Sequence, residues 1–116
     1  MGLVKLGELP ELKIAEGIMG RAVTAGTVTV MHVLLDEGAV IHEHSHHHEQ
    51  VVNVIEGEME LVVDGVSHNL TPGKVMVLAP NVVHSGHVIK ECRVVDVFHP
   101  VREDFAGSSF GGYNKC

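Results

Sequence analysis

Aromatic residues are scarce in this chain of 116 residues, which has no Trp, one Tyr and three Phe. Because 45% of its residues are nonetheless hydrophobic, the chain is too apolar to be disordered, and its core must be aliphatic. Cysteine is scarce too, since Cys92 and Cys116 are too few for a disulfide framework. The length suits one domain, which we assign to residues 1–116.

Positive charge and long apolar runs are also lacking. Eight Lys and Arg stand against 15 Asp and Glu, for a formal net charge of −7, so we expect neither nucleic acid nor an anionic membrane as a partner. No apolar run approaches the ~18 residues of a membrane span, and the first residues lack a signal-peptide core. We therefore expect a cytoplasmic protein. The chain also lacks a Gly-x-Gly-x-x-Gly motif and a phosphate loop, which argues against nucleotide cofactors.

Short apolar runs separated by turn residues fill the chain from Thr24 onward. They lie at residues 28–35, 51–55, 59–63, 66–70, 74–79, 82–89 and 93–98. Asp64-Gly65 between two runs predicts a tight hairpin, because such turns need positive φ. This spacing predicts an all-β sandwich or small barrel with its core at about residues 24–105. Residues 1–20 are expected to form an extended lead-in with short strands, and the Gly- and Ser-rich residues 106–116 a flexible tail.

Histidine is abundant, with ten residues, five of them between positions 42 and 48. On a strand His44 and His46 share a face, so they could ligate one metal ion. Gln50 and His84 could complete the site if the inward faces of a barrel meet. The tract could equally be a solvated loop that binds metal only adventitiously, and composition leaves both readings open.

Two segments resemble the motifs of the cupin superfamily. Gly38-x5-His44-x-His46-x3-Gln50-x6-Gly57 is similar to the first motif, with Gln where most cupins have Glu. The segment from Gly73 to His84 is similar to the second, with Ala79 where Pro is usual. The resemblance covers about residues 25–100 and implies a single-domain jelly-roll β-barrel.

The same resemblance implies one divalent metal ion, held by His44, His46, Gln50 and His84. Zinc, nickel, iron and manganese all suit such a set to differing degrees. Because Gln is neutral where Glu would be charged, the bound ion keeps its full charge as a Lewis acid. His42, His47 and His48 match no ligand position and are expected to surround the ligands or face solvent.

The end of the last apolar run, from Asp96 to Phe105, is similar to the KdgF family of pectin-degradation cupins. This chain differs in having His99 where the family usually has Ser. The resemblance implies an active site at Asp96, Phe98 and Arg102. Alternation puts Asp96 and Phe98 on one face. It leaves open whether Asp96 faces inward as a general base or lies on the surface in an ion pair with Arg102.

The resemblance implies a metal-dependent enzyme that acts on a small sugar acid and converts 4,5-unsaturated uronate monomers to the open-chain keto form. Asp96 would move a proton, Arg102 would grip the carboxylate and Phe98 would orient the ring. A metal-dependent dioxygenase and a non-catalytic small-molecule-binding cupin remain alternatives. We expect a homodimer, because the barrel has edges to cover and residues 1–20 could pair with a neighbour's sheet.

Overall fold

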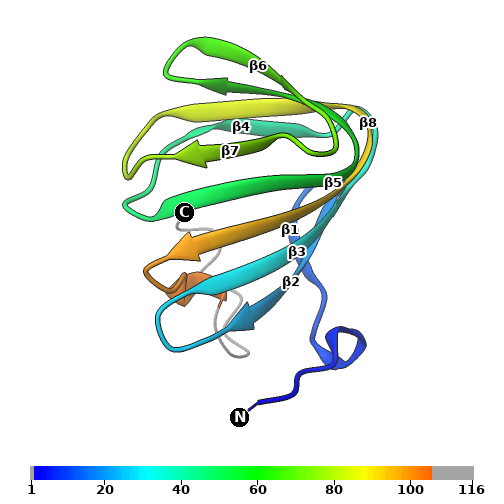
Figure 1. Cartoon of the computed structure of the whole chain (residues 1–116). Coiled ribbons are helices and arrows are strands. Elements are labelled where there is room, and N and C mark those ends of the chain that lie inside the picture. The colour runs from blue at the N-terminus through cyan, green and yellow to red at the C-terminus, as the bar shows by residue number, and fades with distance from the viewer. Residues whose placement is uncertain (1, 106–116) are drawn as a thin grey trace.

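The computed structural model describes residues 2–105, which form a strongly curved antiparallel sheet (Figure 1). The all-β prediction is confirmed, and the predicted tail at 106–116 lies outside the described residues. No helix in residues 2–105 is long and apolar enough to cross a membrane. The elements are η1 (Leu6–Glu8), β1 (Leu12–Ala15), β2 (Ile18–Thr24), β3 (Thr29–Leu35), β4 (Val40–His44), β5 (Glu49–Val63), β6 (Val66–Leu70), β7 (Val75–Leu78), β8 (His84–His99) and η2 (Glu103–Phe105), where η denotes a 3₁₀ helix.

Two long strands, β5 and β8, organise the sheet. They pair antiparallel from Glu49 opposite His99 to Val63 opposite His84. The strand order is β1-β2-β3-β8-β5-β6, with β4 paired to β8 and β7 paired to β5. Both long strands bend sharply near their middle, so their two halves lie in different layers with the core between them (Figure 1). One layer holds β1, β2 and β3, and the other holds β4 and β6.

The bend in β5 lies at Glu56-Gly57-Glu58, where the sequence predicts a turn between two strands. The strand instead continues, with register shifts against β8 between Val54 and Met59. Gly57 has φ of +92°, and a Cβ there would lie 2.1 Å from the Glu91 carbonyl oxygen. A residue with a side chain could not occupy this bulge, so the glycine marks the point where the sheet folds over. β8 likewise runs unbroken across residues 90–92, where the sequence suggests a gap.

The Asp64-Gly65 hairpin between β5 and β6 is confirmed. Both residues have positive φ, +48° and +79°, as a two-residue turn that follows the sheet twist requires. The core is aliphatic, as the composition predicts, with Met31, Met59 and Leu78 among its most deeply buried side chains. The sheet begins earlier than the predicted core, because residues 12–24 form the edge strand β1 and its partner β2.

Candidate metal centre and its cavity

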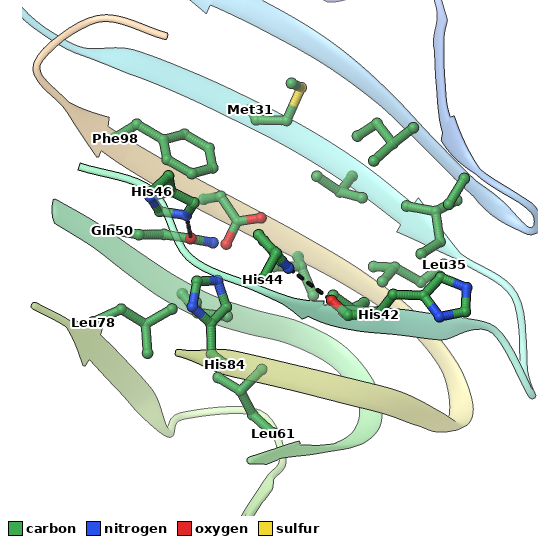
Figure 2. Close-up of a pocket in the computed structure, with 18 of the residues that line it drawn as sticks. Met31, Leu35, His42, His44, His46, Gln50, Leu61, Leu78, His84 and Phe98 are labelled. Atoms are coloured by element: carbon green, nitrogen blue, oxygen red, sulfur yellow. Dashed lines mark hydrogen bonds between the residues drawn. The ribbon is translucent and has the colours of Figure 1, made fainter. Parts of the chain in front are cut away.

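A cavity of about 410 Å³ lies between the two layers (Figure 2). It is lined by all seven residues that the sequence singles out: His44, His46, Gln50, His84, Asp96, Phe98 and Arg102. Asp96 therefore faces inward together with Phe98, which resolves the alternative between an inward carboxylate and a surface ion pair. The structure brings all of these side chains together, while their chemical roles stay predictions.

Three histidines lie together at one end of the cavity, which we call the polar end. One ring nitrogen from each of His44, His46 and His84 lies within 4.8 Å of the others. His44 ends β4 and His84 begins β8, and the two residues are direct partners across the strands. His46 was expected on the same strand as His44, but the strand ends at His44 and the following loop carries His46 into the cavity.

Each of these rings is fixed by a backbone carbonyl. Nδ1 of His44 donates to the His42 oxygen at 2.7 Å, Nδ1 of His46 to the His48 oxygen at 3.1 Å, and Nδ1 of His84 to the Val82 oxygen at 3.0 Å. Because a carbonyl can only accept, the proton sits on Nδ1 and the Nε2 lone pair is free for a ligand. This is the orientation that metal-binding histidines use.

The carbonyl supports are the part of the site that the sequence does not reveal. His42 and His48 were expected to surround the ligands or face solvent, and both contact the ligand rings through main-chain oxygens, which any residue type supplies. The His48 ring is buried, and its Nδ1 has no hydrogen-bond partner among the described residues. His47 is exposed and lies against His48, with ring centroids 3.9 Å apart.

Gln50 completes the polar end. Its Oε1 lies 3.1 Å from Nε2 of His46 (Figure 2). Its side chain also hydrogen-bonds the Asp96 carboxylate, which accepts, so the amide nitrogen faces Asp96 and the oxygen faces His46. Two acceptor atoms thus face each other, and a cation bound by both would relieve their repulsion. The donor set of three Nε2 atoms and one amide oxygen fits a first-row divalent metal.

The local electrostatics favour the neutral imidazoles of His46 and His84. Burial lowers the pKa of His46 to about 4, helped by the nearby Arg102 guanidinium. Burial also lowers the pKa of His84. Since only a neutral imidazole can donate its lone pair, both rings are ready to bind a metal ion at neutral pH.

Asp96 is the carboxylate beside this group. Its Oδ1 is buried and has no hydrogen-bond partner among the described residues. Burial raises the pKa of Asp96 to about 7, although the Gln50 hydrogen bond and the Arg102 charge act in the opposite direction. A carboxyl group that titrates near neutrality can both take up and release a proton, as a general acid–base group must.

Arg102 is buried at the edge of the cavity. Its guanidinium lies 4.8 Å from the ring centroid of Phe98 and 4.4 Å from that of Phe105. Nε donates to Oδ1 of Asp104 at 3.0 Å, and Nη2 donates to Oδ2 at 2.7 Å. Arg102 was expected to grip a substrate carboxylate, and here its guanidinium makes two parallel bonds to Asp104. Neither Asp104 nor Phe105 was predicted as a site residue, although they lie only two and three residues after Arg102.

Known proteins match this chain in sequence and in structure. The family model described as Cupin domain matches residues 31–98. The Pectin degradation protein KdgF of Dickeya dadantii (strain 3937) is 29% identical over 101 residues, which cover 84% of this chain and 92% of the relative. The structure of KdgF from Halomonas sp. aligns with a TM-score of 0.82 and 25% identity, covering 90% of this chain and 97% of that chain.

A second solved structure, an RmlC-like cupin from Shewanella frigidimarina NCIMB 400, aligns with a TM-score of 0.85 and 29% identity. That alignment covers 91% of this chain and 96% of the other. Together these matches confirm the predicted cupin fold and the resemblance to KdgF.

Proposed function

This chain belongs to the cupin domain family, and on that premise we propose that it is a metal-dependent enzyme that converts 4,5-unsaturated uronate monomers to open-chain keto sugar acids. One observation carries the proposal. The inward carboxylate of Asp96 lies in the same cavity as three converging histidines and Gln50. The likeness to a curated pectin degradation protein supports the choice of substrate.

His44, His46, Gln50 and His84 would hold one divalent ion, which could be zinc, nickel, iron or manganese. When bound, that ion supplies Lewis-acid polarisation of substrate oxygens. The protein's own contribution is to orient the ligands. The three carbonyls that fix the Nδ1 protons keep the Nε2 atoms aimed at one point, so little reorganisation is needed on binding.

Asp96 would perform the proton transfer. In the proposed isomerisation the C1 hydroxyl loses its proton to Asp96, and the bond between C1 and the ring oxygen breaks. The ring oxygen becomes the C5 ketone as the C4–C5 double bond is lost, and Asp96 returns the proton to C4. Atoms and electrons balance without an oxidant or reductant. The raised pKa of Asp96, which burial brings to about 7, suits both halves of this exchange.

Arg102 and Phe98 would position the substrate. The guanidinium places a fixed positive charge near Asp96. This charge would balance the negative charge of the substrate carboxylate. The Phe98 ring lies between the two sides of the site, with its centroid 5.8 Å from that of His46 and 4.8 Å from the guanidinium carbon of Arg102. It would provide an apolar wall against one face of the sugar ring.

The test is direct, because the conjugated alkene of the unsaturated uronate absorbs ultraviolet light and the product does not. Protein loaded in turn with zinc, nickel, iron(II) and manganese(II) is mixed with unsaturated galacturonate, and the loss of absorbance is followed. We expect at least one form to accelerate the loss well above the spontaneous rate. If every metal-loaded form leaves the spontaneous rate unchanged, the uronate assignment is wrong, although the cupin fold stands.

A further inference from the structure

The cavity continues beyond its polar end along strand β3. Met31, Val33 and Leu35 all line it, and they pair with Asp96, Val94 and Cys92 of β8 in turn. A strand rises about 3.4 Å per residue, so the wall extends roughly 14 Å from the level of Asp96 to that of Leu35. Figure 2 shows Met31 near the ligand group and Leu35 at the far end of the same strand.

This extension is apolar on one whole side. Every described lining residue that comes from β1, β2 or β3 is apolar: Ile14, Ala15, Ile18, Met31, Val33 and Leu35. The polar lining residues come instead from β4, the loop that follows it, β5, β8 and the segment leading to η2. The cavity therefore has a metal-binding end and, along β3 toward Leu35, a part with an aliphatic wall, which we call the aliphatic end; His42 of β4 also lies near Leu35 there (Figure 2).

A sugar ring does not match the aliphatic end. Hydroxyl groups that face the wall formed by β1, β2 and β3 would lose their bonds to water without gaining protein partners, which opposes binding. An alkyl chain gains free energy from the same surroundings. The volume of about 410 Å³ is within the ~300–1,000 Å³ usual for small-molecule pockets and leaves room for more than the reacting group alone.

We propose that this cavity binds carboxylic acids that carry an aliphatic chain. The carboxylate and an adjacent oxygen occupy the end formed by the histidines and Gln50, and the chain lies along β3 toward Leu35. The inference rests on the metal centre of the proposed function, and it does not require that a uronate be the substrate. The proposal adds a class of ligand, acids with an aliphatic chain, that the residues of the polar end alone would not distinguish from other acids.

The experiment uses straight-chain 2-oxo acids, whose carboxylate and keto oxygens can chelate one metal ion. Zinc-loaded protein is titrated by calorimetry with 2-oxobutanoate, 2-oxohexanoate and 2-oxooctanoate. Burial of one methylene contributes about fourfold in affinity, so we expect a gain of at least tenfold from the first acid to the second. A flat series, or no binding of any of the acids, would overturn the proposal.

The location of the chain is tested separately by methyl NMR of methionine-labelled protein. Met31 and Met59 line the cavity, whereas Met19 does not. 2-Oxooctanoate should shift the methyl signals of Met31 and Met59 and leave that of Met19 in place. Shifts of equal size at Met19 would place the ligand outside the cavity and contradict the proposal.

A variant closes the aliphatic end without changing the polar end. Ala15 lines the cavity from the edge strand β1 and is only half-buried, so Ala15→Leu adds bulk where the fold can tolerate it. It should reduce 2-oxooctanoate affinity at least tenfold and leave 2-oxobutanoate nearly unchanged. Ala25→Leu in an exposed turn is the matched control and should match wild type. An unchanged chain-length gradient in Ala15→Leu would show that the chain binds elsewhere.

The two proposals fail independently. If the protein shows the chain-length gradient but does not isomerise unsaturated galacturonate, the aliphatic ligand class is supported and the uronate substrate is contradicted. If the protein isomerises the uronate but shows a flat affinity series, the proposed function is supported and the aliphatic ligand class is contradicted.

Discussion

Arg102 and Asp104 form a bidentate ion pair, with Nε to Oδ1 at 3.0 Å and Nη2 to Oδ2 at 2.7 Å, and the guanidinium lies against the rings of Phe98 and Phe105. The Arg102 backbone nitrogen also donates to Thr29 Oγ1 at 2.9 Å. The backbone hydrogen bond ties the segment after β8 to β3, and the ion pair fixes the guanidinium before any ligand arrives. Preorganisation of this kind lowers the entropy that substrate binding must overcome.

Arg102→Ala should accordingly affect both stability and substrate binding. Removing the cation takes the bidentate ion pair away from Asp104, whose side chain is only 16% exposed, and we expect a loss of about 3 kcal/mol in unfolding free energy. KM for the uronate should rise more than kcat falls. Arg93→Ala is the control, because its pair with Glu56 at 3.6 Å is exposed and worth less than about 1 kcal/mol. Equal losses in the two variants would contradict the role assigned to Arg102.

Asp96→Asn should abolish most turnover while the fold and the bound metal are retained. A general acid–base group contributes about 10²–10⁴-fold, and Asn cannot exchange a proton in this range. The measurements are the ultraviolet rate and the metal content by elemental analysis. Asp64→Asn in the β5–β6 hairpin is the control, since Asn also adopts positive φ, and it should retain wild-type turnover. Wild-type rates in Asp96→Asn would exclude Asp96 as the proton carrier.

Asp96 should also give the metal-free protein a characteristic pH dependence of stability. Burial raises its folded-state pKa to about 7 from the ordinary 3.8, so the folded state holds this proton more tightly than the unfolded state. Its contribution to stability is therefore lost progressively as pH rises from about 4 to above 7. Asp96→Asn lacks this loss. With a chelator present to remove metal, urea denaturation should show that the unfolding free energy of Asp96→Asn increases relative to that of wild type between pH 5 and pH 8. A pH-independent difference would mean that Asp96 titrates normally.

Gly57→Ala should destabilise the fold strongly. An alanine there would combine positive φ with a contact of 2.1 Å to the Glu91 carbonyl oxygen, and two pieces of backbone would have to separate. We expect a loss of at least about 2 kcal/mol in unfolding free energy. Gly26→Ala has nothing within 4 Å of its Cβ and should cost far less. Similar midpoints for the two variants in chemical denaturation would show that the bulge tolerates a side chain.

The predicted homodimer can be tested on the outer face of the sheet. Strand pairings align Val23, Val30, Val97, Val51 and Val77 in one row across β2, β3, β8, β5 and β7. Val77 is 60% exposed, and apolar rows of this kind favour sheet-on-sheet packing. Light scattering at micromolar concentration should give a dimer for wild type and a monomer for Val77→Glu. Val66→Glu on β6, where Val66 is 57% exposed, should remain dimeric. A monomeric wild type would contradict the prediction.

Features that depend on neighbours in sequence are predicted well from the sequence. The Asp64-Gly65 hairpin requires only that both residues accept positive φ, and the common face of Asp96 and Phe98 follows from strand alternation. In both cases the physical preference is local, so the order of residues contains it. The set of His44, His46, Gln50 and His84 comes instead from the resemblance to the cupin motifs.

Only the tertiary structure decides what depends on residues far apart in the chain. Glu56-Gly57-Glu58 has the local preferences of a turn, and the pairing of β5 with β8 makes it a bulge inside one strand. The carbonyls that set the histidine tautomers are main-chain groups, which every residue type has. No residue type in the sequence therefore predicts them. Arg102 meets Asp104 only two residues away, yet its burial against Phe98 and Phe105 depends on how the chain leaves β8. Long-range pairing and burial select among conformations that local preference leaves nearly equal in energy.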